Sequence, residues 1–211
     1  MTIFAARRVV PRLGDGALDI ALDDGSLGEI DTGHLARYDV VLFANTSGEL
    51  PLGDQQKRSL LDYVSAGGGF VGTHSAADTF YTWPDYGALL GAVFKEHPWT
   101  QEATVTVEDQ GHPVTQGLGS SFRMMEEFYT FREEPRSHAH VLLSLDAASV
   151  GATGDYPLAW CSRYGAGRVF YTALGHFDAT WEDPRFQQLL AHGLLWAAGR
   201  SAGGDDACRA P

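Results

Sequence analysis

Apolar runs alternate with helically spaced apolar residues along the middle of the chain. Residues 38–45 form an apolar run bounded by polar positions, which is typical of a strand buried on both faces of a parallel sheet. A helix is predicted from about Asp54, its expected N-cap, until Gly67 supplies a natural stop. Residues 69–72 form the next short strand. This succession of strand, helix and strand predicts a right-handed βαβ unit and favours an α/β fold.

The second half of the chain predicts more strands and a final helix. Residues 79–100 are rich in aromatic residues and proline, which predicts a loop with a short helix around 85–90. The last helix is expected to begin at Pro184, behind a cap formed by Asp183. Alternating or apolar runs predict further strands at 103–108, 126–131 and 141–145, and a hairpin of 157–164 with 168–173.

The two ends of the chain carry weaker patterns. Residues 1–35 are atypical, with only a stub of strand at 3–5 and a short strand at 18–22. The small, polar segment 201–211 predicts a disordered tail. We therefore expect a single domain over residues 1–200, because no internal repeat or linker divides it.

Composition narrows the class of protein. The chain has 211 residues, 44% of them hydrophobic, which is enough for one domain with a full core. A net charge of −12 without a Lys/Arg cluster argues against nucleic acid and anionic membranes as partners. No apolar run approaches the ~18 residues of a membrane span and no signal peptide is evident, so a cytoplasmic location is expected. Cys161 and Cys208 are expected to be free thiols in a reducing compartment.

Two histidines follow short apolar strands and sit among small residues. His74 comes after the strand 69–72, at a tight turn that would project its side chain above the sheet edge. His176 follows the strand 168–173 in the same way. One such histidine is more often a hydrogen-bonded loop residue, but two in matched positions favour a shared crevice. Asp178 could fix the tautomer of His176 or could simply form a turn.

Further side chains could complete a metal site. Glu126 and Glu127 are neighbours on a predicted strand, so only one of them can face the crevice, and we assign the assisting role to Glu126. His74, His97 and His176 could hold a divalent ion such as zinc together with a carboxylate. No local spacing such as HxxxH supports the metal, and the alternative of a solvated glutamate pair with a surface histidine is slightly favoured for His97.

Aromatic and small polar residues near these positions are candidates for substrate contacts. Loop aromatics could stack on the flat apolar face of a sugar ring, although most aromatics in proteins pack in the core. The candidates for substrate binding are Asn45, Thr73, Ser75, Trp99, Tyr129 and Trp181. The histidines expected to be surface or structural are His34, His112, His138, His140 and His192.

Five motifs occur in order between about residues 36 and 199. They are Tyr-Asp-Val-Val at 38–41, Ala-Gly-Gly-Gly-Phe-Val-Gly-Thr-His at 66–74, Phe-Lys-Glu-His-Pro at 94–98, Glu-Glu-Phe-Tyr at 126–129 and Tyr-Thr-Ala-Leu-Gly-His at 171–176. This succession closely resembles the ThuA-like family, which includes trehalose-utilisation proteins. The resemblance implies the class I glutamine amidotransferase-like fold, a flavodoxin-like three-layer α/β sandwich with a mostly parallel sheet. Family members usually open with an apolar strand, a histidine-bearing loop and a long helix, which residues 1–35 do not show.

The resemblance also bears on the chemistry. The amidotransferase elbow Gly-x-Cys-x-Gly corresponds to residues 72–76, so His74 stands where the nucleophilic cysteine would be. The His-x-Glu pair of that family corresponds to His176 and Asp178. Without a thiolate no glutamyl thioester can form, so glutaminase activity is not expected. Ser75 lies one position away from the tip of the elbow, which makes it a poor substitute nucleophile.

Two classes of function follow from these observations. The resemblance implies a small-molecule carbohydrate partner, and an enzyme acting on keto-sugars or glycosides as a lyase, hydrolase or isomerase. In that hypothesis His74 and His176 act as an acid/base pair or as metal ligands. The alternative is a non-catalytic sugar-binding or regulatory protein on an amidotransferase scaffold without its nucleophile. A homo-oligomer formed through an edge strand such as 103–108 is a further expectation.

Overall fold

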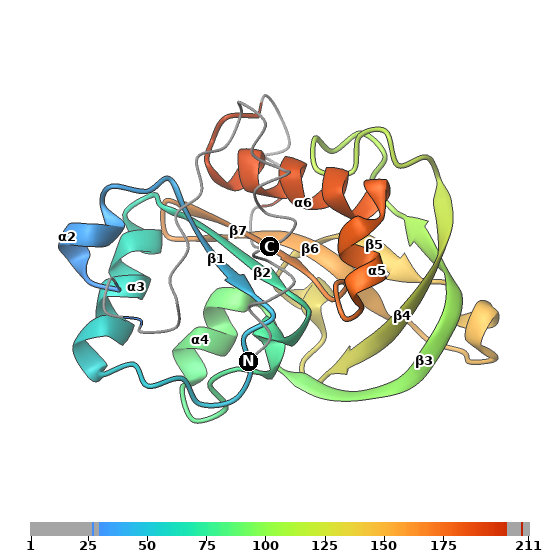
Figure 1. Cartoon of the computed structure of the whole chain (residues 1–211), viewed down its shortest axis with the longest axis horizontal. Coiled ribbons are helices and arrows are strands. Elements are labelled where there is room, and N and C mark those ends of the chain that lie inside the picture. The colour runs from blue at the N-terminus through green and yellow to red at the C-terminus, as the bar shows by residue number, and fades with distance from the viewer. Residues whose placement is uncertain (1–26, 28–29, 202–207, 209–211) are drawn as a thin grey trace.

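The computed structural model describes Leu27, residues 30–201 and Cys208 (Figure 1). The strands predicted at 3–5 and 18–22 lie outside these described residues. The elements are α2 (Thr32–Leu35), β1 (Val40–Ala44), α3 (Asp54–Ser65), β2 (Gly69–Thr73), the 3-10 turn η1 (His74–Asp78), α4 (Pro84–Leu90), β3 (Phe94–Val107), β4 (Ser121–Phe131), η2 (Pro135–Ser137), β5 (His140–Leu145), η3 (Ala147–Val150), β6 (Pro157–Tyr164), β7 (Gly167–Thr172), α5 (Asp178–Glu182) and α6 (Pro184–Ala197).

The seven strands of the described chain form one curled sheet in the order β1-β2-β7-β6-β5-β3-β4. The pairs β1–β2 and β2–β7 are parallel. The pairs β7–β6, β6–β5, β5–β3 and β3–β4 are antiparallel. The α/β class is confirmed, but the prediction of a mostly parallel sheet is wrong. Parallel neighbours need long crossovers, and no α-helix lies between β3 and β7 in the fully described stretch 94–172.

The parallel part of the sheet arises as the hydrophobic pattern indicates. The helix α3 connects β1 to β2, although its N-cap is Gly53 rather than Asp54. Helices cover both faces of this part. A Cβ on Gly193 of α6 would press into the ring of Phe170, whereas a Cβ on Gly72 would meet Leu90 of α4 on the other side. The carboxyl ends of β2 and β7 therefore emerge together between these two helices.

The antiparallel part differs more from the expectation. Residues 94–100, for which a loop is predicted, begin the long strand β3, and bulges near Glu96 and Trp99 break its pairing with β4. The sequence did not predict this part of the strand because it is irregular and mostly exposed. Its apolar and polar residues therefore do not alternate regularly. The segment 103–108 is not a free edge either, since β3 pairs with both β4 and β5. The segment 103–108 therefore offers no unpaired strand edge to a second subunit.

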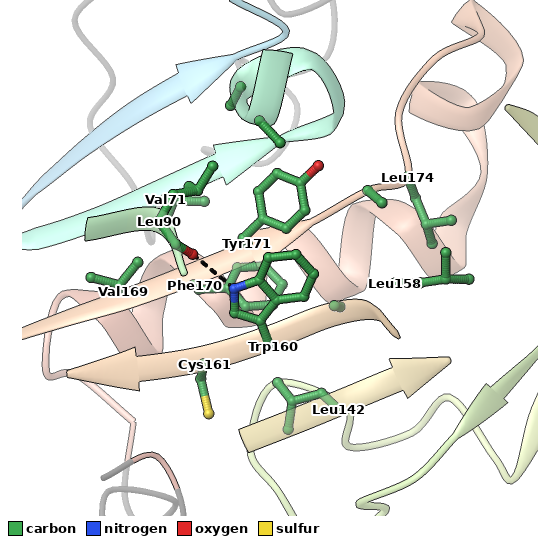
Figure 2. Close-up of a cluster of buried hydrophobic side chains, with 14 of the residues drawn as sticks. Val71, Leu90, Leu142, Leu158, Trp160, Cys161, Val169, Phe170, Tyr171 and Leu174 are labelled. Carbon is green, nitrogen blue, oxygen red and sulfur yellow. Dashed lines mark hydrogen bonds between the residues drawn. The ribbon is translucent and has the colours of Figure 1, made fainter. Parts of the chain in front are cut away.

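Large side chains on β6 and β7 pack between the sheet and α4. Trp160 lies against Tyr171 with ring centroids 4.5 Å apart, and both side chains are fully buried (Figure 2). The indole N–H of Trp160 donates to the carbonyl of Leu90 at 2.8 Å. Burial of a large aromatic requires such a partner for its polar group. This layer fixes α4 and the strand end that carries Tyr171.

The two cysteines form a disulfide, so the prediction of two free thiols is wrong. Cys161 on β6 is bonded to Cys208, with Cα atoms 5.3 Å apart, and both residues are fully buried. The segment around Cys208 has no hydrophobic period that could have placed it against β6. The cysteines therefore do not indicate a reducing compartment.

No helix within the described part of the chain is long and apolar enough to span a bilayer. This agrees with the absence of a long apolar run in the sequence.

Candidate functional site

The turn after β2 holds His74 in a strained conformation. Its backbone φ is 44°, in the left-handed region that a non-glycine residue seldom adopts, and the residue begins η1. The hydroxyl of Tyr171 donates to the carbonyl oxygen of His74 at 2.7 Å. The residue is only 3% exposed. Strain of this kind persists where surrounding contacts enforce it, and it is concentrated at functional sites.

A backbone carbonyl fixes the tautomer of His74. Its Nδ1 lies 2.9 Å from the carbonyl oxygen of Ala173, which can only accept, so Nδ1 carries the hydrogen. The lone pair of Nε2 is therefore free to accept a proton or to bind a metal ion. This N–H to carbonyl arrangement is the one that commonly orients metal-binding histidines.

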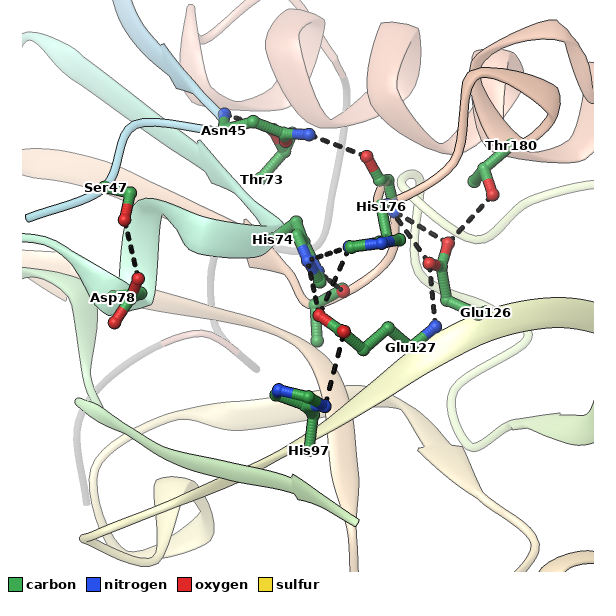
Figure 3. A network of polar contacts seen from close by, with 12 residues as sticks. Asn45, Ser47, Thr73, His74, Asp78, His97, Glu126, Glu127, His176 and Thr180 are labelled. Atoms are coloured by element: carbon green, nitrogen blue, oxygen red, sulfur yellow. Dashed lines mark hydrogen bonds and ion pairs between the residues drawn. The ribbon is translucent and has the colours of Figure 1, made fainter. Parts of the chain in front are cut away.

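The loop after β7 brings His176 to the same place. Its Nδ1 lies 3.0 Å from Nε2 of His74, and the ring centroids are 5.0 Å apart (Figure 3). Gly175, with a φ of 120°, makes the turn before it. His176 is the more open of the two histidines, with 37% of its side chain exposed. The two strand ends thus place both imidazoles side by side, as their matched positions predict.

Three residues that we expected to bind substrate instead hold the Gly175 turn. The amide of Asn45 and the indole of Trp181 both donate to the carbonyl of Gly175, at 2.7 and 2.8 Å. The hydroxyl of Thr73 donates to the side-chain oxygen of Asn45 at 2.8 Å. All three residues are buried, and their polar atoms are used inside the protein. Their observed contacts support a positioning role.

Glu126 is fully buried behind the histidines and does not face them. One carboxylate oxygen accepts from the backbone N–H of Gly175 at 2.9 Å and from the hydroxyl of Thr180 at 2.9 Å. The other accepts from the N–H of His176 at 3.1 Å and of Glu127 at 3.0 Å. The carboxylate therefore organises the loop that carries His176 (Figure 3).

Glu127 is the carboxylate that reaches the histidines. Its Oε2 lies 3.3 Å from Nε2 of His74 and 3.2 Å from Nδ1 of His176. Its Oε1 lies 3.3 Å from Nδ1 of His97, which is half exposed at the mouth of the crevice. The hydrogen bond with His74 lowers the pKa of Glu127 below its usual value; burial opposes this shift, and the nearby His176 and His97 add to it. Glu127 is thus anionic at neutral pH.

Tyr129 forms one wall of the site. Its ring lies 4.1 Å from the ring of His74, centroid to centroid, and 4.3 Å from Phe94. Burial raises the pKa of the Tyr129 hydroxyl well above its usual value, and the negative charge of Glu127 adds to this shift. The hydroxyl therefore stays protonated and can only act as a neutral hydrogen-bonding group.

The other predicted residues lie at the margin or elsewhere. Trp99 packs edge-on against Tyr156, with ring centroids 4.9 Å apart, and makes no ring contact with the histidines in the described structure. Ser75 follows His74 in η1 and its carbonyl accepts from Thr79. Asp178 is exposed at the start of α5, and within residues 30–201 it forms no hydrogen bond with His176.

The three inward-facing ligand atoms have the spacing of a metal site. Nε2 of His74, Nδ1 of His176 and Oε2 of Glu127 are mutually separated by 3.0, 3.2 and 3.3 Å. Tetrahedral zinc with bonds of about 2.0–2.1 Å places its ligand atoms about 3.3 Å apart. Two nitrogens and an anionic oxygen also suit zinc chemically. The same distances allow the two imidazoles to share a proton, so the site fits both metal binding and acid/base chemistry.

The sequence pointed to this site through its strand ends but not to Glu127. The alternation of β4 shows that one glutamate faces each side, yet it does not say which side holds the crevice. The structure places Glu127 and Tyr129 on the face of the exposed Met125, whereas Met124, Glu126 and Phe128 are buried on the other side, and the two adjacent methionines give no sign of this in the sequence.

Fold and site together define an α/β protein in which two histidines follow parallel strands and a carboxylate reaches them from an antiparallel strand. The profile of the ThuA family, described as trehalose utilisation, matches residues 14–197. The chain therefore belongs to the ThuA family. No curated protein matches its sequence.

Solved structures share this fold. A protein of Bacteroides uniformis described as ThuA-like is 30% identical, with a TM-score of 0.76 over 91% of this chain and 82% of that chain. A Salmonella typhimurium protein described as cytoplasmic is 15% identical, with a TM-score of 0.68 over 92% and 86%. A Thermoplasma acidophilum protein described as part of a GMP synthase is 15% identical, with a TM-score of 0.59 over 94% and 89%. The last two comparisons concern the fold alone.

Proposed function

We propose that this ThuA-family protein is an enzyme that acts on a small keto-sugar or glycoside at a metal site formed by His74, His176 and Glu127. The observation that carries the proposal is the triangle of ligand atoms with edges of 3.0 to 3.3 Å. A carbohydrate substrate rests on the family, whose description is trehalose utilisation. A cytoplasmic location remains part of the proposal, in line with the Salmonella protein of the same fold.

The proposed chemistry would come from an ion held by these three side chains and from the residues around it. When bound, a divalent ion would supply Lewis acidity at a carbonyl or hydroxyl oxygen of the sugar. The bond from Nδ1 of His74 to the carbonyl of Ala173 directs Nε2 toward His176 and Glu127, where the ion would be held. His97 lies against Glu127 with half of its side chain exposed to solvent. Tyr129 offers an aromatic wall and a neutral hydroxyl to a sugar ring.

Glutaminase activity does not belong to the proposal. The residue at the elbow is an imidazole whose Nδ1 is bound to a carbonyl and whose Nε2 faces His176 and Glu127. Such a side chain cannot form the thioester that amidotransferase chemistry requires. Ser75 lies beside the elbow tip and lacks a neighbouring base among the described contacts.

Metal content tests the first part of the proposal. Untagged protein is dialysed against zinc, manganese and buffer alone, and the bound metal is counted by elemental analysis. We expect one ion per wild-type chain, and loss of binding in His176→Ala and Glu127→Gln, because each variant removes one of three ligands. His138→Ala, which changes an exposed histidine after η2, is the matched control and should keep the ion. An apo wild type, or equal metal in all four proteins, contradicts the metal assignment.

Substrate screening separates catalysis from binding. A panel of keto-sugars and glycosides is examined by thermal shift and by product analysis, each with and without metal. The proposal expects turnover that Glu127→Gln abolishes while ligand-induced stabilisation is retained in part. Stabilisation by a sugar without turnover, unaffected by metal, would favour the non-catalytic sugar-binding protein instead.

A further inference from the structure

A second group of reactive side chains lies far from the histidine site in sequence. Cys161 on β6, Cys208 near the end of the chain and His112 in the turn after β3 are all buried, with exposures of 0, 0 and 2%. Nε2 of His112 lies 3.2 Å from the sulfur of Cys208 and 3.8 Å from that of Cys161. An imidazole therefore sits against the disulfide, closer to Cys208.

The turn that carries His112 decides which nitrogen holds its hydrogen. The backbone N–H of Val114 donates to Nδ1 of His112 at 3.2 Å, so Nδ1 is the unprotonated nitrogen. Nε2 then carries the hydrogen and points it toward the two sulfurs. Asp109 holds the turn by accepting from the backbone N–H of His112 at 3.1 Å. The N–H on Nε2 of His112 therefore already faces the sulfurs while they are bonded to each other and uncharged.

This tautomer disfavours a metal at the same place. The three side chains have the donor types of a Cys2His zinc site and lie close enough together. Metal binding through Nε2 would need the hydrogen to sit on Nδ1, where it would oppose the N–H of Val114. An N–H donor aimed at sulfur instead suits a thiolate, because a donor beside a cysteine lowers its thiol pKa and favours the thiolate.

A polar pocket lies beside the start of β5, the strand that pairs with the one carrying Cys161. It has a volume of about 300 Å³ and is lined by charged groups that include Asp109, Arg136 and His140. His140 is the register partner of Cys161 on the neighbouring strand, and its Nε2 lies 2.8 Å from the carboxylate of Asp109. The ring of His140 lies 6.2 Å from that of His112.

We propose that Cys161, Cys208 and His112 form a reversible thiol–disulfide exchange site that takes small dithiols and their cyclic disulfides. In reduction, a thiolate of the dithiol attacks the sulfur of Cys161, the Cys161–Cys208 bond breaks, and Cys208 leaves as a thiolate beside Nε2–H of His112. The second thiol of the reagent then attacks the mixed disulfide and releases Cys161. Two electrons pass to the protein, the reagent becomes a cyclic disulfide, and two protons end on the cysteines.

Cys208 has the better-placed sulfur for both directions of this exchange. The N–H of His112 lies closer to Cys208 than to Cys161, so it stabilises negative charge on the sulfur of Cys208 as that sulfur leaves. When the bond closes, the stabilised thiolate of Cys208 is the attacking group on a mixed disulfide at Cys161. His112 acts as a positioning residue, because it works through the cysteine and not on the reagent.

Redox titration of the full-length folded protein tests the proposal. The protein is equilibrated in mixtures of reduced and oxidised dithiothreitol, trapped with an alkylating agent and weighed as intact mass. We expect one two-electron transition in which both cysteines are alkylated together, with circular dichroism unchanged. Exchange kinetics are then measured in the same buffers. His112→Phe, which keeps a ring without an N–H, should exchange more slowly by about tenfold.

Two matched variants guard the interpretation. His138→Gln alters an exposed histidine that is not among the residues lining the pocket, and it should exchange within about twofold of the wild type. His112→Gln replaces His112→Phe if the latter does not fold.

Several outcomes overturn the proposal. Two alkylated thiols in fully oxidised buffer would mean that no disulfide forms. A disulfide that opens only with global unfolding would be a structural crosslink. Equal rates in wild type and both His112 variants would remove the histidine from the chemistry. Stoichiometric zinc in the reduced protein that disappears in Cys208→Ser would replace exchange by metal binding.

Discussion

Glu126 and Glu127 are adjacent in the chain, yet the structure gives them opposite surroundings. The first accepts four hydrogen bonds inside the protein, and the second faces three histidines at the crevice. Alternation along β4 separates them onto two faces of one strand. The pair therefore allows stability and ligand binding to be separated at the scale of single residues.

The two glutamine substitutions should have opposite effects. Glu126→Gln turns one buried acceptor oxygen into an N–H₂ donor that opposes backbone N–H groups, so it should lower the unfolding free energy by about 1–3 kcal/mol. Glu127→Gln should leave stability within about 1 kcal/mol and abolish metal binding. Urea unfolding and elemental analysis measure the two effects. Equal stability losses in both variants would contradict this division.

The backbone strain at His74 can be tested without its imidazole. His74→Ala and His74→Gly both remove the side chain, but only glycine adopts a φ of 44° without a Cβ penalty. We expect His74→Gly to be more stable than His74→Ala by about 1 kcal/mol, measured by urea unfolding. A more stable alanine variant would mean that the turn relaxes when the imidazole is removed.

At the scale of elements, the sequence predicts the parts whose pattern is local. The run before Asn45, the helix α3 and the capped helix α6 are found close to where the pattern places them, because burial and capping leave signals within a few residues. The first half of β3 and the short helix α5 were missed. Pairing partners and crossover direction depend on residues far away in the chain, so the mixed sheet had no local signal.

An ion cluster links Arg136 of η2 to Glu108, just after β3, and to Asp155, just before β6. This cluster should make the stability of the fold depend on pH. Arg136 donates to both carboxylate oxygens of Glu108, at 2.6 and 2.7 Å, and to the carboxylate of Asp155. Burial would raise the pKa of Glu108, but the hydrogen bonds from Arg136 lower it, and they also lower the pKa of Asp155. This stabilisation is present above the unfolded-state pKa values and is lost as pH falls through the lower folded values.

The substitution Arg136→Gln isolates that contribution. The variant should be less stable than the wild type at pH 7, and the difference should shrink as the pH falls below about 4, where the carboxylates are protonated. Urea midpoints between pH 7 and pH 2.5 measure the trend. A gap that widens in acid would have the wrong sign for this cluster.

At the scale of the whole molecule, the site joins the two parts of the sheet. His74 and His176 come from the parallel strands and Glu127 comes from the antiparallel hairpin. The sequence could bring the two histidines together because the strand-end rule applies to parallel strands. The sequence could not show that Glu127, and not Glu126, approaches the histidines. The hairpin of β3 and β4 reaches them only because the whole sheet is curled.

The disulfide links β6 to a residue 47 positions later and should stabilise the whole fold. By loop closure alone, a crosslink of this span contributes about 4 kcal/mol to the free energy of unfolding. We expect Cys208→Ser to lower that free energy by up to this amount, and reductant to destabilise the wild type but not the variant. Thermal and urea unfolding with and without reductant measure the effect. A variant as stable as the oxidised wild type would contradict it.

The order of the three ligands along the chain has a consequence for synthesis. His74 leaves the ribosome first, Glu127 follows, and His176 emerges only after the strands that hold both halves of the sheet have been made. A nascent chain can therefore offer no complete site until nearly all of the fold exists. An ion captured there would come late and would favour the finished arrangement of all three segments by mass action. Occupancy of the site would then show that the strands leading to all three side chains have been made and folded.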